Sequence, residues 1–270
     1  MLTFTTMNVV GFCSIENLHI PLNPSCTILI KAPNGKGKST ILSALVWAIY
    51  GKNLKGVSEV TDFLYSKNLI NAPIALSEFF EACKNYPIFF AKDKDNKWFS
   101  TALLGYKEGQ NLFVDKKGIW KELHYIPAFI RSYPFILVNQ ENKKELVIAI
   151  EGEYLNEKES SKKLFDENGN NSEFLNRAIG FLNQYYTDSL SANEFIKQLE
   201  TWELLEEKIV NITNSKNEKF TLGGFYVVNE EKLKHLSKKK KDDICAKDAY
   251  SLITAHLISL SNIQKLGSIK

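Results

Sequence analysis

The sequence is poor in the residues that build disulfide frameworks and metal sites. It contains four cysteines and four histidines in 270 residues. Cys13, Cys26, Cys83 and Cys245 are scattered without a Cys-x-x-Cys pair, and no histidine has a cysteine or a second histidine at metal-ligand spacing. This pattern excludes a zinc ribbon and a disulfide-stapled scaffold, and it predicts reduced core thiols in a cytoplasmic protein.

The sequence also lacks a hydrophobic run long enough to cross a membrane. The longest run, residues 41–50, is about half the length that a transmembrane helix needs. The first residues contain no basic segment followed by an apolar one, so we expect no secretory signal. We therefore expect a cytoplasmic protein without a membrane span.

A strong charge of one sign is absent as well. The net charge of +3 is the difference between 34 basic and 31 acidic residues, so no overall field attracts nucleic acid or an anionic membrane. The one basic run, residues 238–241, stands beside Asp242 and Asp243 and is expected to be a solvated linker. We expect no nucleic-acid partner unless the N-terminal segment described next is functional.

The N-terminal part contains a short β-rich run, a glycine-rich turn and an apolar helix in succession. Residues 26–31 predict the strand, and residues 41–50, which are apolar nearly all round, predict a buried helix. Between them lies a turn with the pattern of a P-loop. The residues expected to bind a nucleotide there are Asn34, Gly35, Lys36, Gly37, Lys38, Ser39 and Thr40.

The residue types of this turn suit a phosphate ligand. Gly35 and Gly37 permit left-handed φ angles, which lets backbone N–H groups close around phosphate oxygens. Lys38 would reach the β- and γ-phosphates of ATP, and Ser39 would ligate Mg²⁺. The pattern departs from a complete P-loop at Ala32, where glycine is expected.

Residues 34–40 and 44–52 together resemble the N-terminal lobe of the SbcC/SMC-type recombination ATPases of phages. The resemblance covers residues 1–58 and implies that Lys38 and Ser39 bind ATP and Mg²⁺. In that family a second lobe supplies the Walker B acid and the signature motif. Here residues 146–151 end in glutamate rather than aspartate, and residues 222–224 lack the signature serine. We therefore expect an incomplete ATPase that binds ATP weakly and hydrolyses it negligibly.

Residues 59–270 show the periodicities of an α+β domain. We expect a mostly antiparallel sheet with C-terminal helices, because local turns separate the β-rich runs and helical periods begin only near Ser172. The expected strands are residues 86–91, 99–106, 111–114, 145–150 and 220–228, with the glycine pair 223–224 at a bulge or a close contact. The expected helices are residues 172–186, 191–205, 229–236 and 248–266.

Residues 120–138 are expected to organise this domain. The segment is rich in aromatic and β-branched residues, which suits a buried sheet, and Pro127 and Pro134 should lie at strand ends or bulges. Arg131 interrupts two apolar runs, and we expect it to be a buried guanidinium paired with carbonyls or a carboxylate. A functional arginine that faces a cleft is the alternative. His256, on an apolar helix, is expected to be a core histidine.

The second part of the chain resembles the SapC family in order along residues 61–270. The segments that carry the resemblance are residues 78–79, 86–90, 102–105, 110–115, 118–120, 125–135, 164–166, 223–228 and 255–260. The family takes its name from a locus for bacterial surface-layer protein synthesis and export, and the resemblance implies no particular reaction. Ser132 stands where a second arginine would be expected.

Two domains are therefore expected, a P-loop lobe at residues 1–58 and a SapC-like domain at residues 59–270. The leading interpretation is a non-catalytic accessory factor, linked through an unknown protein partner to surface-layer or cell-envelope protein export. Its truncated P-loop would bind ATP weakly. The alternative is an ATP-dependent DNA recombination or repair nuclease subunit of SbcC/SMC type, which a complete Walker B, a signature motif and a coiled coil would favour.

Overall fold

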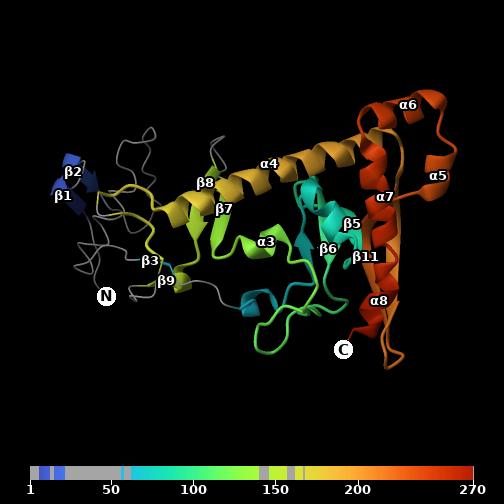
Figure 1. The fold of residues 1–270 in the computed structure, drawn as a ribbon, viewed down its shortest axis with the longest axis horizontal. Coiled ribbons are helices and arrows are strands. Elements are labelled where there is room, and N and C mark those ends of the chain that lie inside the picture. The colour runs from blue at the N-terminus through green and yellow to red at the C-terminus, as the bar shows by residue number, and fades with distance from the viewer. Residues whose placement is uncertain are drawn as a thin grey trace. The chain divides into compact units, whose positions relative to one another are not determined.

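A computed structural model describes most of the chain from residue 62 onward and short segments before it (Figure 1). The described residues are 6–12, 15–21, 56–57, 62–139, 146–156, 162–166 and 168–269. The expected strand 26–31, the phosphate-binding residues Asn34 to Thr40 and the expected helix 41–50 lie outside them. The P-loop therefore stays a prediction.

The chain divides into two compact units. The first contains Met1–Glu59 and Pro134–Gly180, and the second contains Val60–Tyr133 and Phe181–Lys270. Helix α4 (Glu173–Thr201) belongs to the first unit up to Gly180 and to the second from Phe181. The expected domain boundary after residue 58 is not tested by this division and stays a prediction.

The described part of the first unit contains short antiparallel pairs. The pairs are β1 (Thr6–Phe12) with β2 (Ile15–Pro21), β3 (Gly56–Val57) with β9 (Leu155–Asn156), and β7 (Phe135–Asn139) with β8 (Leu146–Ile150). A 3₁₀ turn, η3 (Gly152–Tyr154), follows β8. Ser172 marks the start of α4 as expected, because its hydroxyl oxygen accepts the backbone N–H of Leu175 at 3.1 Å.

The second unit is built on a five-stranded antiparallel sheet. The strand order is β10 (Leu205–Thr213), β11 (Lys219–Val228), β5 (Ile88–Lys92), β6 (Trp98–Leu103) and β4 (Asn71–Pro73). The α+β class with a mostly antiparallel sheet and C-terminal helices is thus confirmed. Strand β10 was not predicted, because the expected helix 191–205 ran into its start.

Helices cover one face of this sheet around Phe90. The Phe90 ring lies 6.5 Å from Phe79 on α2 (Phe79–Ala82), 6.3 Å from Phe195 on α4, and 4.6 Å from His256 on α7 (Ala249–Ser259), measured between centroids. All four residues are buried. The other helices that the structure describes in this unit are η1 (Leu64–Ser66), η2 (Leu76–Glu78), α3 (Ala128–Arg131), α5 (Glu230–Lys234), α6 (Lys238–Ala246) and α8 (Asn262–Ser268).

Several predictions for the helical residues need correction. Residues 173–201 form one helix rather than two, since the hydroxyls of Ser189 and Ser191 donate to the carbonyls four residues earlier and the backbone helix continues past them. The expected helix 248–266 is divided into α7 and α8, and α8 begins at Asn262, whose buried amide donates to the carbonyl of Cys83 at 2.8 Å. The lysine run 238–241 lies in α6, capped by Ser237, and is not a linker. Cys245 on the same helix is exposed and is therefore not the core thiol that was expected.

The segment 120–138 is only partly the strand that its composition predicts. Residues 128–131 form the short helix α3, and Pro127 stands at its N-cap, where a fixed φ and a missing N–H are tolerated. Pro134 immediately precedes β7, as expected of a strand end. The expected strand 111–114 is reduced to a single antiparallel bridge between Val114 and Trp120.

Four tight turns share one construction. In each, an Asp or Asn side chain accepts the backbone N–H groups two and four residues later, and the residue three positions later has a positive φ. Glycine or asparagine occupies that left-handed position each time, as the steric cost for other residues requires. The turns begin at Asp93, Asp115, Asp166 and Asn214, with Asn96, Gly118, Gly169 and Asn217 left-handed.

The glycine pair 223–224 lies at an irregularity of the sheet, as expected. The register between β10 and β11 shifts between Lys208 and Val210, opposite these glycines. Gly224 has a φ of +81°, which a side chain would make unfavourable. The pair therefore accommodates a β-bulge in the longest strand pair of the sheet.

His256 is a core histidine, which confirms the expectation from the sequence. Its side chain is completely buried, and its Nε2 accepts the backbone N–H of Val228 at 3.0 Å. Burial disfavours the charged imidazolium and lowers the pKa of His256 from 6.5 to about 3. The folded protein therefore holds this side chain neutral.

We predict that this histidine makes the protein sensitive to mild acid. Because the folded-state pKa lies below the unfolded one, its contribution is present above pH 6.5 and is lost as the pH falls toward 3. Between pH 7 and pH 5 the loss should be about 2 kcal/mol in the free energy of unfolding. Urea denaturation at the two pH values measures it.

His256→Gln removes the titrating group, while its amide oxygen can still accept the Val228 N–H, so the variant should show a smaller loss between pH 7 and pH 5. The exposed His235→Gln serves as the control and should keep the wild-type difference. An equal pH dependence in wild type and His256→Gln would show that another group causes it.

Candidate functional site

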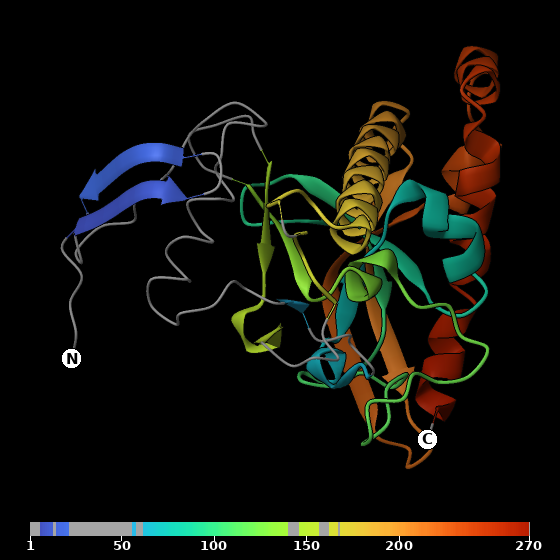
Figure 2. The ribbon, with the colours of Figure 1, turned by 60° about the vertical axis from the view of Figure 1, so that its left-hand side comes forward.

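A small cavity of about 190 Å³ lies in the second unit, where helix α4 passes the short turns η2 and α3. Helix α3 lies beside α4 in both views of the ribbon (Figure 1, Figure 2). Most of the residues around the cavity are polar or aromatic. They are Ala75, Ser77, Glu78, Tyr125, Ala128, Arg131, Phe181, Gln184, Tyr185 and Asp188.

One wall of the cavity is a single face of α4. Phe181, Gln184, Tyr185 and Asp188 are spaced at i, i+3, i+4 and i+7, which places them on the same side of a helix. Asp188 is held in place from two directions, because Gln184 donates to its Oδ1 at 2.9 Å and the hydroxyl of Ser77 donates to its Oδ2 at 2.7 Å. The carboxylate is therefore fixed at the cavity wall.

Glu78 forms the floor between the two turns and is 5% exposed. Its Oε2 accepts the N–H of Ala75 at 2.6 Å, and its Oε1 accepts the N–H of Ala128 at 2.6 Å and the hydroxyl of Tyr125 at 2.9 Å. Burial raises the pKa of Glu78, and these hydrogen bonds with the charge of Arg131 oppose the rise. One carboxylate thus connects segments 50 residues apart in the chain.

Arg131 extends this network to the cavity. Its Nη2 donates to the Tyr125 hydroxyl at 3.0 Å, and its Nε donates to the Ile126 carbonyl at 3.0 Å. The guanidinium carbon lies 5.5 Å from the Tyr125 ring centroid and 5.3 Å from that of Phe181, within the range of cation–π contacts. Pairing with a carbonyl was expected, but the expected burial is wrong, because Arg131 is an exposed residue. Its position at the cavity agrees with the alternative expectation, an arginine that faces a cleft.

Two tyrosines of the cavity keep their protons over the physiological range. Burial raises the pKa of Tyr125 to about 12, and the negative charge of Glu78 adds to the effect. Burial also raises the pKa of Tyr185, again with Glu78 contributing. Both hydroxyls therefore act as neutral hydrogen-bonding groups.

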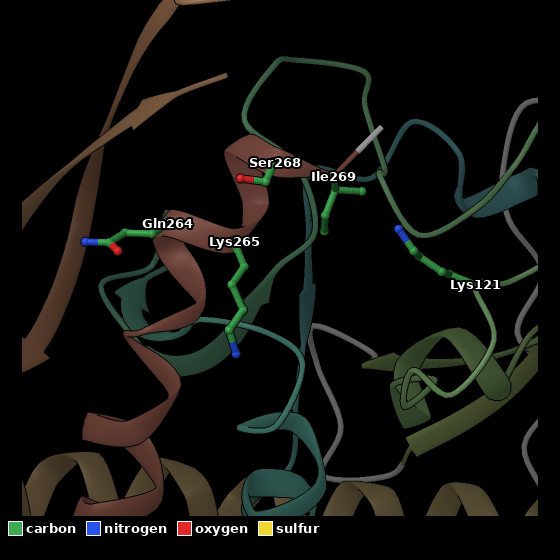
Figure 3. Close-up of a pocket in the computed structure, with 5 residues that line it drawn as sticks. All are labelled: Lys121, Gln264, Lys265, Ser268 and Ile269. Atoms are coloured by element: carbon green, nitrogen blue, oxygen red, sulfur yellow. The ribbon is translucent and has the colours of Figure 1, made fainter. Parts of the chain in front are cut away.

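A second hollow, of about 530 Å³, lies at helix α8 (Figure 3). It is lined by Lys121 from a loop and by Gln264, Lys265, Ser268 and Ile269 from α8 and its end. Lys265 donates to Asn262 at 2.8 Å, so part of its hydrogen-bonding capacity is used within its own helix. The polar groups that line this second hollow do not form a connected network like that of the first cavity. The first cavity is therefore the better candidate site.

The sequence matches a family model, SapC, over residues 52–266. The match covers well over half of the chain and includes every residue that lines the cavity. The chain belongs to the SapC family. No curated protein and no solved structure matches this SapC protein. The family match begins after Asn34 to Thr40, so it does not bear on the predicted P-loop.

Sequence reasoning found part of this site. Arg131 and Tyr125 lie in the segment 125–135 that carries the family resemblance, and Glu78 lies in the segment 78–79. Neither Glu78 nor Asp188 was recognised as a site residue, because each is an ordinary acidic residue in an amphipathic stretch. The available signal was the helical spacing of Phe181, Tyr185 and Asp188, which places two aromatic rings and a carboxylate on one face.

Two negative findings hold for the part of the chain that the structure describes. None of its helices combines the length and the apolar character needed to cross a membrane. Within the same residues, no three His, Cys, Asp or Glu side chains are grouped so that they could hold a metal ion.

We predict that Glu78→Gln destabilises the protein by about 1–3 kcal/mol, the range found when a buried hydrogen-bonding group loses its partner. The substitution keeps the shape of the side chain but replaces one acceptor oxygen by an NH₂ donor. This donor must then face either the Ala75 N–H or the Ala128 N–H with the Tyr125 hydroxyl. Urea denaturation of the purified variant measures the effect.

Glu81→Gln is the matched control, since Glu81 is an exposed glutamate three residues away that pairs with Lys84 at the surface. It should unfold like the wild type. Arg131→Ala should lie between the two, because the exposed guanidinium loses contacts without leaving a buried charge. If Glu78→Gln unfolded like Glu81→Gln, the buried carboxylate would not hold the two turns together.

Proposed function

We propose that this SapC-family protein is a non-catalytic accessory factor of surface-layer or cell-envelope protein export, acting in the cytoplasm through a protein partner. The family membership supports the link to the envelope. The proposal of a non-catalytic role rests on the hydrogen bonding of Glu78, the most buried acidic group at the cavity. Its two oxygens already accept three hydrogen bonds from the protein.

A general base must have a free lone pair within hydrogen-bonding reach of the proton that it takes. In Glu78 three of the roughly four acceptor positions of the carboxylate already hold Ala75, Ala128 and Tyr125, and the residue is only 5% exposed, so little of the carboxylate is open to a substrate. Ser77, the hydroxyl at the cavity mouth, donates to the carboxylate of Asp188 and not to an imidazole. These contacts favour a site that recognises a ligand over a site that transforms one.

Site-specific photo-crosslinking in cells that express the full chain tests this function. A photoreactive residue at Gln184, an exposed position of the cavity wall, should crosslink to secretion or surface-layer components that mass spectrometry identifies. The same residue placed at Lys208, on an exposed part of strand β10, should not give these products. Crosslinks to DNA-recombination proteins or to nucleic acid in their place would support the alternative function.

We also propose that the N-terminal P-loop binds ATP weakly and turns it over negligibly. The sequence of Asn34 to Thr40 supports binding, and the glutamate at the end of residues 146–151 argues against hydrolysis. Calorimetry with ATP and Mg²⁺ should detect weak binding that Lys38→Ala abolishes and Lys36→Ala largely keeps, since Lys38 has the position that reaches the phosphates. Magnesium-dependent hydrolysis that disappears in Lys38→Ala would instead favour the recombination ATPase.

A further inference from the structure

The cavity beside α4 presents opposite charges on different walls. Arg131 contributes a guanidinium from α3, and Asp188 contributes a carboxylate from α4. The two groups do not form an ion pair with each other among the described residues. Each makes its direct hydrogen bonds to neutral groups, although Arg131 also lies near the charge of Glu78, and each keeps hydrogen-bonding positions that a ligand can use.

The guanidinium has hydrogen-bonding capacity left. An arginine side chain carries five N–H donors, and Arg131 uses one to Tyr125 and one to the Ile126 carbonyl. Its contacts with the rings of Tyr125 and Phe181 fix its plane. A fixed, planar guanidinium with free N–H groups is suited to a carboxylate, which it can bind through two parallel hydrogen bonds.

The carboxylate of Asp188 has capacity of the complementary kind. Each of its oxygens accepts one hydrogen bond, from Gln184 or from Ser77, and each carboxylate oxygen can accept a second. Both neighbours are uncharged, so the negative charge of Asp188 is not neutralised by them. A cationic donor such as an ammonium group would satisfy it, whereas a second anion would be repelled.

The size and the lining of the cavity further limit which ligands can bind. The cavity of about 190 Å³ is smaller than the range of about 300–1,000 Å³ typical of pockets for drug-sized ligands. The lining also includes the ring of Phe181 and the methyl group of Ala128, which offer apolar contact. A ligand that fits must therefore be small, carry both charges, and have a short apolar part.

We propose that this cavity binds a free α-amino acid, with the ligand carboxylate on Arg131 and the ligand ammonium group on Asp188. The proposal rests on the proposed function in so far as it treats the cavity as a ligand site. Glu78 holds Arg131 in place through the Tyr125 hydroxyl and is a positioning residue. A phosphate or another simple anion fits less well, because Asp188 would face it.

Calorimetry on the full chain with each of the twenty amino acids at millimolar concentration tests the proposal. At least one should bind. Its N-acetyl derivative, which lacks the ammonium charge, and its decarboxylated amine, which lacks the carboxylate, should each bind roughly tenfold more weakly or worse, because each loses a charge-assisted hydrogen bond.

Two variants test which charged group of the ligand binds Asp188 and which binds Arg131. Asp188→Asn keeps the shape of the side chain, and it should weaken the amino acid to the level of its N-acetyl derivative while leaving that derivative unchanged. Arg131→Met should weaken binding of the amino acid to the level of its decarboxylated amine, while the affinity for that amine stays unchanged. Asp242→Asn, outside the cavity, is the surface-charge control and should bind like the wild type.

Two results would overturn the proposal. One is the absence of binding for all twenty amino acids while both variants and the wild type remain folded by circular dichroism. The other is equal affinity for an amino acid and its N-acetyl derivative, which would point to a peptide C-terminus as the ligand. Neither result changes the crosslinking outcome, so a failure here is distinguishable from a failure of the proposed accessory function.

Discussion

The buried carboxylate of Glu78 is the constraint on which the arrangement around the cavity depends. An unpaired charge in this position would cost several kcal/mol, so the fold must bring donors to it. The donors come from the N–H groups of Ala75 and Ala128 and from the hydroxyl of Tyr125. Because these groups belong to different segments, satisfying one side chain also fixes the turn before α2 against the turn that begins α3.

The buried charge of Glu78 also determines how Arg131 is oriented at the cavity. Tyr125 donates to Glu78 and accepts from Arg131, so the orientation of the guanidinium is set by the buried charge through one hydroxyl group. The backbone of the same segment is held from below, where the hydroxyl of Tyr86 donates to the Tyr125 carbonyl. A rigid rim of this kind reduces the loss of conformational entropy when a ligand binds. The site is therefore prepared for binding by contacts that belong to the fold.

The sequence predicted those helices and strands that local periodicity or a cap residue determines. It did not predict the elements that depend on contacts between residues distant in the chain. Periodicity located strands β5, β6 and β11, and the cap residue Asn229 located α5. The helix α3 was missed, because its residues favour a strand and the contact of Ala128 with Glu78, distant in the chain, favours the helical turn. Arg131 was placed in the core for a similar reason, since an apolar neighbourhood in sequence does not reveal which side chain reaches a cavity.

Hydrogen exchange at the amides of Ala75 and Ala128 tests most directly whether the Glu78 carboxylate holds the two turns together. Measured by NMR on the full chain, both amides should exchange as slowly as those of the core strands β5 and β6, although both lie in or beside short turns and outside the sheet. Exchange at either amide as fast as that of an unstructured peptide would contradict the account, because the carboxylate would then not hold that segment.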